Sequence, residues 1–348
     1  MLQATTPVRC STPSVKHAEE RPVNLLPMLE PIRDDLAAVE TRMLAAVRET
    51  YEPLSSALHA ILSSGGKRLR PALVILAARL HHWNPEPVTS LAAAVELLHT
   101  ATLIHDDTID EAQVRRGHET LNATWNRAAT ILAGDFMFAR AAALAAETNN
   151  TRVASIFANT LIAICEGELR QMLSLFNWRG SREDYYQRIC RKTASLFAAA
   201  TEAGAILGQA SEDRVRALRD YGQHLGMAFQ MVDDILDFAG DEQHLGKPVG
   251  SDLRQGIATL PIYHYLQQGG DEALVEAALV RDSADDAGRE QAVAELVMAV
   301  VSSPAIESCR QEARRFASQA VDTVIALADG PYQRALCDLA RFVVSRDL

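Results

Sequence analysis

The sequence is poor in several features that mark whole classes of protein. Aromatic residues make up 5% of its 348 residues, and its five cysteines form no CxxC pair and no zinc-type spacing. A formal net charge of -11 argues against the basic surface that nucleic-acid binding requires. No uncharged apolar run reaches the length of a membrane-spanning helix. We therefore expect no nucleic-acid partner, no transmembrane segment, and a reducing, cytoplasmic location.

Signals for nucleotide binding are missing as well. The chain contains no GxxxxGK[ST] loop. It also shows no strand-like alternation that would provide the βαβ context of a dinucleotide site. Both common routes to nucleotide binding are therefore disfavoured.

What the sequence does contain is helical periodicity. From residue 25 onward, apolar residues recur at intervals of three and four, as in Leu36, Val39 and Met43. Clusters of turn formers interrupt the pattern at residues 63–66, 84–85, 149–150, 179–181, 240–250, 268–270 and 330–331. The pattern predicts a disordered tail over residues 1–22 and a single all-α domain of about a dozen helices over residues 23–348. Residues 91–104 and 131–146 are apolar on nearly all sides, which predicts central positions.

Two aspartate clusters follow apolar helical segments. Asp106 and Asp110 are four residues apart, as are Asp233 and Asp237, so each pair projects to one face of its helix. One such cluster alone is equally well explained as a solvated helix end. Like charges at this spacing repel, however, and carboxylates late in a helix oppose its macrodipole. Carboxylates arranged in this way suit Mg²⁺, which is commonly shared between protein acids and substrate phosphates.

Basic residues complete the pattern. They occur in Gly65-Gly66-Lys67-Arg68-Leu69-Arg70-Pro71, in Arg115-Arg116-Gly117, in Lys192-Thr193 and in Gly246-Lys247-Pro248. Arginine forks match pairs of phosphate oxygens, and lysine supplies a point charge. The first of these stretches, taken alone, could also be a turn followed by an exposed basic helix start. Together, the acidic and basic motifs favour a site for a diphosphate group.

With these motifs in place, residues 24–348 closely resemble the trans-isoprenyl diphosphate synthases, or polyprenyl synthetase family, and in particular its medium- and long-chain members. The likeness rests on residues 65–71, on residues 98–107 with Asp110 and residues 115–117, and on residues 226–261 with Phe229-Gln230 and the second aspartate cluster. The resemblance implies an isoprenoid-synthase bundle around a central cavity, and a homodimer.

The resemblance also implies roles for individual residues. Mg²⁺, with three ions when substrate is bound, would be coordinated by Asp106, Asp110 and Asp233, while Asp107, Asp234 and Asp237 complete the acidic lining. The allylic diphosphate would contact Arg115, Lys192, Thr193, Gln230 and Lys247, and the diphosphate of isopentenyl diphosphate would contact Lys67, Arg70, His99 and Arg116. The residues expected to act in catalysis are Asp106, Asp107, Asp110, Lys192, Asp233, Asp234 and Lys247.

The implied reaction condenses isopentenyl diphosphate in trans with a farnesyl or geranylgeranyl type of allylic diphosphate and releases pyrophosphate. Ala101 and Thr102 precede Asp106 by about one helical turn, and with Leu98 they are expected to form the wall of the product cavity. Short-chain relatives place a large aromatic residue there, so a product longer than geranylgeranyl is expected. One departure from the family is Ile257, where many relatives have lysine, and it predicts weaker binding of the allylic substrate.

Three alternatives remain beside this interpretation. The protein could be a short-chain synthase that makes farnesyl or geranylgeranyl diphosphate, or a partner-dependent subunit of a heteromeric polyprenyl synthase. A class I terpene cyclase also carries a DDxxD motif. Its second metal motif reads roughly (N/D)Dxx(S/T)xxxE, and Asp237 occupies the Ser/Thr position here, so the cyclase is disfavoured.

Overall fold

The computed structural model describes residues 25–48, 50–115, 117–240, 248–280, 286–327 and 329–346. The predicted tail, Arg116 and Lys247 lie outside these residues. Within them the chain is helical apart from a single short hairpin, which confirms the all-α prediction.

The elements follow one another with short connections. The N-terminal part comprises α1 (Leu26–Leu29), η1 (Glu30–Ile32), α2 (Arg33–Arg48), α3 (Leu54–Ser63), α4 (Leu69–Arg79) and α5 (Pro85–Ile109). The hairpin strands β1 (Val114–Arg115) and β2 (His118–Glu119) are followed by α6 (Leu121–Thr124), α7 (Arg127–Ala146) and α8 (Thr151–Leu173). Next come α9 (Arg182–Ile189), the π-helical turn η2 (Cys190–Ala194), α10 (Ser195–Leu207) and α11 (Glu212–Ala239). The last elements are α13 (Ser251–Arg254), α14 (Leu260–Gln267), α15 (Glu272–Ala278), α16 (Asp286–Ser302), α17 (Ala305–Ile325) and α18 (Pro331–Ser345).

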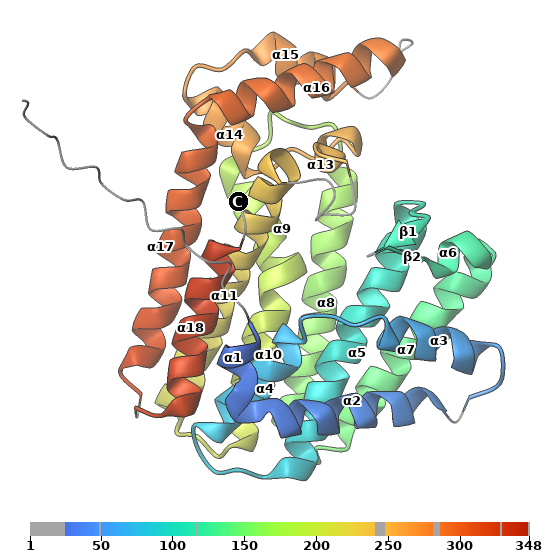
Figure 1. Cartoon of the computed structure of the whole chain (residues 1–348), viewed down its shortest axis with the longest axis vertical. Coiled ribbons are helices and arrows are strands. Elements are labelled where there is room, and N and C mark those ends of the chain that lie inside the picture. The colour runs from blue at the N-terminus through green and yellow to red at the C-terminus, as the bar shows by residue number, and fades with distance from the viewer. Residues whose placement is uncertain are drawn as a thin grey trace, which may run out of the picture.

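Long helices run side by side along the molecule. In Figure 1, α5, α8, α11 and α17 follow its long axis, while α15 and α16 lie across one end. The hairpin β1–β2 stands beyond the C-terminal end of α5 (Figure 1), and Arg346, just after α18, contacts α11 through the carbonyl oxygen of Phe229. The C-terminal ends of α5 and α11, where the two aspartate clusters lie, therefore point toward the same half of the molecule.

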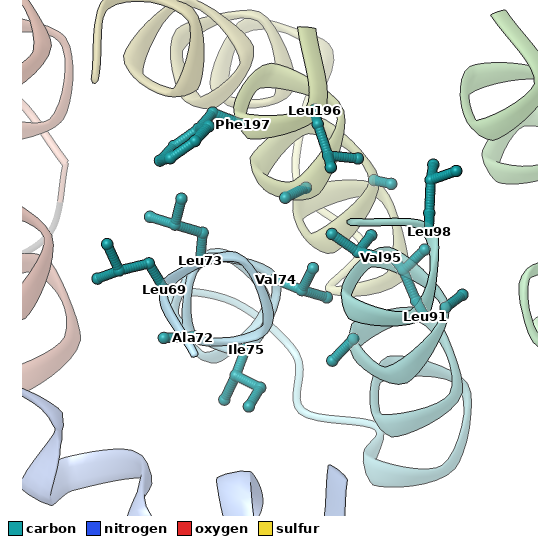
Figure 2. Packing of buried hydrophobic residues seen from close by; sticks show 14 of the residues in the cluster. Leu69, Ala72, Leu73, Val74, Ile75, Leu91, Val95, Leu98, Leu196 and Phe197 are labelled. Atoms are coloured by element: carbon teal, nitrogen blue, oxygen red, sulfur yellow. The ribbon is translucent and has the colours of Figure 1, made fainter. Parts of the chain in front are cut away.

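The core is built around α4. Its residues Leu73, Val74 and Ile75 are fully buried, and Figure 2 shows their side chains leaving α4 toward different neighbours, α5 and α10 among them. Because α4 is apolar on all sides, it can be stable only when enclosed by other helices. Gly204 of α10 allows the closest approach, since a Cβ atom there would lie 2.4 Å from the carbonyl oxygen of Val74.

The two apolar segments singled out in the sequence behave differently. By length and composition, α5 and α7 could each cross a membrane, as could α16 and α17 if that bent pair formed one span. In α5, 72% of the most apolar window is buried inside the protein, which confirms its central position. In α7 the buried share is 39%, and Leu132 is 66% exposed. The prediction that residues 131–146 are enclosed is therefore wrong for the single chain, because only one face of α7 packs against α5.

Candidate active site

The first aspartate cluster lies at the C-terminal end of α5. Asp106 is half-buried, and burial together with the nearby carboxylates of Glu168 and Asp110 raises its pKa to about 6, although Lys192 opposes the shift. Asp110 is exposed and forms the C-cap of the helix. Asp107 points elsewhere: it is 7% exposed and accepts a 2.6 Å hydrogen bond from Nε of Arg115. Asp106 and Asp110 are therefore the pair that is open to a ligand, and Asp107 anchors the hairpin.

Lys192 faces this pair from the π-helical turn η2. Its ammonium lies 2.6 Å from the carboxylate of Glu168 on α8. Burial lowers the pKa of Lys192, but the charges of Asp106, Glu168 and Asp110 outweigh burial and raise it. The lysine is therefore held in its charged form beside the open carboxylates.

Two glycines allow α8 and α11 to approach the backbone of η2 closely. A Cβ atom at Gly167 of α8 would lie 2.7 Å from the backbone nitrogen of Lys192, and one at Gly226 of α11 would lie 2.5 Å from Cα of Ala194. Side chains at these two positions would push η2 away. π-helical turns occur often at functional sites, and here the turn aims Lys192 at one cluster and Thr193 at the other.

The second cluster lies near the C-terminal end of α11, and its three carboxylates have different surroundings. Asp233 is 3.0 Å from Nη1 of Arg346, near the C-terminus. Asp234 is 2% exposed and accepts hydrogen bonds from Gln230 and Tyr185. Asp237 is 1% exposed and accepts the backbone N–H of Asp252 at 3.1 Å. Only Asp233 keeps appreciable contact with solvent.

A short segment after α11 connects the two clusters. The backbone N–H of Asp252 bonds to Asp237, and the side chain of Gln255, three residues later, bonds to Asp110. Ile257, the departure from the family pattern, lies just beyond and is 8% exposed. The two aspartate clusters therefore border one site, with α13 across it.

Basic side chains also lie just before α4 and in its first turn. Arg70 lies over the rings of Phe197 and Phe229, at 4.7 Å and 6.0 Å from their centroids. Lys67 is exposed, 5.7 Å from the Phe342 ring centroid, and His99 is half-buried on α5.

Arg68, between these basic residues, has a structural position. It adopts the left-handed conformation, with φ of 47°, and pairs with the buried Glu96 at 3.1 Å. Its guanidinium also donates to the carbonyl oxygen of Leu62 at 2.7 Å. The motif is thus an anchored loop and not an exposed basic helix start.

The residues expected to form the product wall are not equivalent. Ala101 and Leu98 are fully buried, whereas Thr102 is half-buried. At about 100° per residue, Thr102 lies roughly 40° around the helix from Asp106 and Ala101 roughly 140° from it. Thr102 therefore lies on the same face of α5 as Asp106.

The donor set fits Mg²⁺ bound together with a ligand. Within the described ranges, no three acidic, histidine or cysteine side chains come together as a complete metal-binding group. Asp106, Asp110 and Asp233 instead supply carboxylate oxygens from two sides. Mg²⁺ needs about six oxygens and keeps several positions for water and substrate phosphates, so an incomplete protein set of this chemistry suits it.

Four residues of the site were missed by sequence reasoning: Glu168, Tyr185, Gln255 and Arg346. Each acts on a partner that is distant along the chain, such as Tyr185 on Asp234 or Arg346 on Asp233. None of the four belongs to a motif with a recognisable spacing. The sequence does not indicate that Tyr185, seven residues before Lys192, belongs to the site. Its contact with Asp234 becomes apparent only when α9 lies next to α11.

An all-α bundle that brings two aspartate clusters and several cationic side chains to one site defines a class of proteins that bind diphosphate esters through divalent cations. The family profile of polyprenyl synthetases matches residues 51–296. Heptaprenyl diphosphate synthase component 2 from Geobacillus stearothermophilus is 39% identical over 319 residues, which are 91% of this chain and 97% of that protein. The chain belongs to the polyprenyl synthetase family.

Two further relatives support this assignment. Octaprenyl diphosphate synthase from Escherichia coli (strain K12) is 34% identical over 325 residues, covering 93% of this chain and 100% of the relative. The crystal structure of a polyprenyl synthase from Caulobacter crescentus CB15, complexed with calcium and isoprenyl diphosphate, has a TM-score of 0.86 at 36% identity. That match covers 94% of this chain and 99% of the other.

Proposed function

We propose that this protein is a prenyltransferase that condenses isopentenyl diphosphate in trans with an allylic diphosphate and makes a long-chain polyprenyl diphosphate. The observation that carries the proposal is the placing of Lys192 beside Asp106 and Asp110, with the second cluster across the same site. The names of the relatives, heptaprenyl and octaprenyl diphosphate synthases, support the long product.

Different residues bind the diphosphate groups of the two substrates. Lys192, with Thr193 and Gln230 beside it, binds the diphosphate of the allylic substrate, and Arg115 keeps Asp107 and the hairpin in place at the same end. Lys67, Arg70 and His99 bind isopentenyl diphosphate. Fixed cations stabilise the negative charge that develops on the leaving diphosphate, so the catalysis is electrostatic and positional.

We propose Mg²⁺ as the metal ion, three ions with substrate present, held by Asp106, Asp110 and Asp233. When bound, Mg²⁺ supplies Lewis-acid stabilisation of the departing pyrophosphate. Arg346 lies 3.0 Å from the carboxylate of Asp233, so this ion pair would have to open for Asp233 to hold a cation.

Product length depends on the wall below Asp106. Thr102 presents a small side chain on the face that the growing tail follows. Thr102→Phe should therefore shorten the product. Ala101→Tyr should shorten it too, but because Ala101 is fully buried, the tyrosine must displace neighbouring side chains and lower the stability. If neither variant changes the product spectrum, the wall lies elsewhere.

A homodimer would cover the apolar surface of α7 and α8. On α8 the exposed residues Ile162, Leu169 and Leu173 fall on one face, and Leu132 of α7 is exposed as well. Such a stripe in contact with water is unusual for a monomer and typical of an interface. Light scattering after gel filtration measures the mass of the particle, and Leu169→Glu should reduce it to that of one chain.

The deciding experiment for the function is incubation of the purified chain with Mg²⁺, labelled isopentenyl diphosphate and farnesyl or geranylgeranyl diphosphate, followed by chain-length analysis. Products longer than geranylgeranyl support the proposal. Products that end at farnesyl or geranylgeranyl would favour a short-chain synthase. No elongation would favour a partner-dependent subunit, an alternative suggested by the name "component 2" of one relative.

A further inference from the structure

A buried chain of hydrogen bonds runs from α9 through the second aspartate cluster to η2. The Tyr185 hydroxyl donates to Oδ2 of Asp234 at 2.7 Å, and Nε2 of Gln230 donates to Oδ1 of the same carboxylate at 2.8 Å. Oε1 of Gln230 then accepts from the hydroxyl of Thr193 at 2.7 Å. The chain thus joins three separate elements and ends at residues proposed to bind the allylic diphosphate.

The direction of each bond follows from the chemistry of the groups. An ionised carboxylate only accepts, so the amide nitrogen of Gln230 must face Asp234 and its oxygen must face Thr193. Both oxygens of Asp234 are used inside the protein, where its side chain is 2% exposed. Asp234 therefore sets the orientation of Gln230, and this role differs from that of the solvent-accessible Asp233.

Tyr185 completes the coordination of Asp234. Its ring is 1% exposed and packs against Tyr186 and Tyr263, so the hydroxyl has little freedom to turn elsewhere. Without that hydroxyl, one oxygen of Asp234 would have no donor in a dry surrounding, and the carboxylate would be free to rotate. Such a rotation would move the acceptor that fixes Gln230.

A second buried tyrosine, Tyr221, has a hydroxyl that binds only the main chain and therefore serves as a comparison for Tyr185. Tyr221 is 0% exposed, and its hydroxyl donates at 2.7 Å to the backbone carbonyl oxygen of Leu336. The bond has the same length and the burial is equal, but the acceptor is main chain between α11 and α18. Tyr185 differs only in that its acceptor belongs to the aspartate motif.

We propose that Tyr185 is a positioning residue for the prenyl transfer, acting through Asp234 and Gln230 to orient Thr193 and the Gln230 amide toward the allylic diphosphate. The inference rests on the proposed function of the site. It predicts a selective effect on one substrate, because the three hydrogen bonds join α9, α11 and η2, whereas Lys67 and Arg70, which are proposed to bind the other diphosphate, lie just before and in the first turn of α4.

The test compares Tyr185→Phe with Tyr221→Phe, each of which removes one buried hydroxyl. Both variants should lose similar stability in urea unfolding. Tyr185→Phe should lower kcat/KM for farnesyl diphosphate on the order of 5- to 50-fold and leave KM for isopentenyl diphosphate within about twofold. Tyr221→Phe should keep both values within about twofold of the parent chain. Equal kinetic losses in the two variants, or an unchanged Tyr185→Phe, would overturn the proposal.

Two further measurements test the role of Tyr185 independently of the proposed prenyl transfer. Calorimetric binding of farnesyl thiolodiphosphate with Mg²⁺ needs no turnover, and Tyr185→Phe should weaken it while Tyr221→Phe does not. Thr193→Val removes the last link, so combining it with Tyr185→Phe should add less than the sum of the two losses. If the parent chain binds but fails to elongate, the proposed function fails, and the binding comparison still decides the role of Tyr185. Fully additive losses would mean that the two residues act independently.

Discussion

The two aspartate clusters have the same DDxxD sequence and very different surroundings. In the first, Asp106 lies open beside Lys192, Asp110 is exposed and is bonded by Gln255, and Asp107 is tied to Arg115. In the second, Asp234 and Asp237 are buried and hydrogen-bonded inside the protein, and Asp233 is paired with Arg346. Two copies of one motif therefore have different roles in this protein. The first cluster leaves carboxylates accessible to a ligand, whereas most of the second cluster binds neighbouring protein groups.

The open carboxylate of Asp106 lowers the stability of the folded chain at neutral pH. Burial raises the pKa of Asp106 to about 6, which means that its charge is less favourable in the folded than in the unfolded chain. Between the ordinary aspartate pKa of 3.8 and about 6 the folded state binds more protons, so stability falls as the pH rises through this window. The unfavourable contribution is absent below the window and complete above it.

The largest expected effect comes from Asp106→Asn, which removes an open carboxylate. Prenyl transfer should fall by about 10²- to 10³-fold, because a group that supports charge stabilisation is lost. In the absence of divalent cations, the melting temperature at pH 7 should rise, and the gain should shrink as the pH falls toward 4. Calorimetric melting with EDTA at several pH values checks this. A variant that is less stable than the parent at pH 7 would show that Asp106 supports the fold.

Asp234→Ala tests the opposite case. It leaves the hydroxyl of Tyr185 and the amide of Gln230 without their acceptor, at a cost of about 1–3 kcal/mol. Loss of a buried charge whose pKa is raised to about 6 offsets part of this cost. Urea unfolding should show destabilisation for Asp234→Ala and none for the matched Asp106→Ala. If both variants unfold at the parent's midpoint, the contrast between the clusters is wrong.

Arg346→Gln removes the cation that competes for Asp233. The concentration of Mg²⁺ at half-maximal binding of farnesyl thiolodiphosphate should fall about two- to fivefold, which corresponds to an ion pair of modest strength. The control is Arg341→Gln in α18, the helix that Arg346 follows; the Arg341 side chain is 67% exposed and pairs with Asp338. A shift of equal size in the control would assign the effect to net charge alone.

An equally small effect is expected from Ile257→Lys, which restores the basic residue that many relatives carry. Its added charge enters the segment between the clusters and should lower KM for the allylic substrate about two- to fivefold. Ile257→Met keeps the long apolar stem without the charge and should leave KM unchanged. An unaltered KM in the lysine variant would show that the departure from the family pattern has no consequence for binding.

Much of this site could be predicted from the sequence because the information is local. Four-residue spacing places Asp106 with Asp110 on any helix, and the glycines and basic residues of the loop at residues 65–71 form a contiguous motif. Helical periodicity likewise determined the fold class. Such features need no knowledge of which helices become neighbours.

Only the tertiary structure decided what each carboxylate does. From the sequence, Asp107 and Asp234 are expected to complete the acidic lining of the site, yet Arg115 binds the first carboxylate and Tyr185 with Gln230 the second. These partners come from eight, 49 and four residues away, and two of the three are on other elements. Spacing along one helix fixes the face on which a side chain lies, whereas burial and hydrogen-bond partners depend on the helices packed against that face. For that reason the sequence determined the motif and the fold class, and the packing of α9, η2 and α11 determined which aspartates remain open to a ligand.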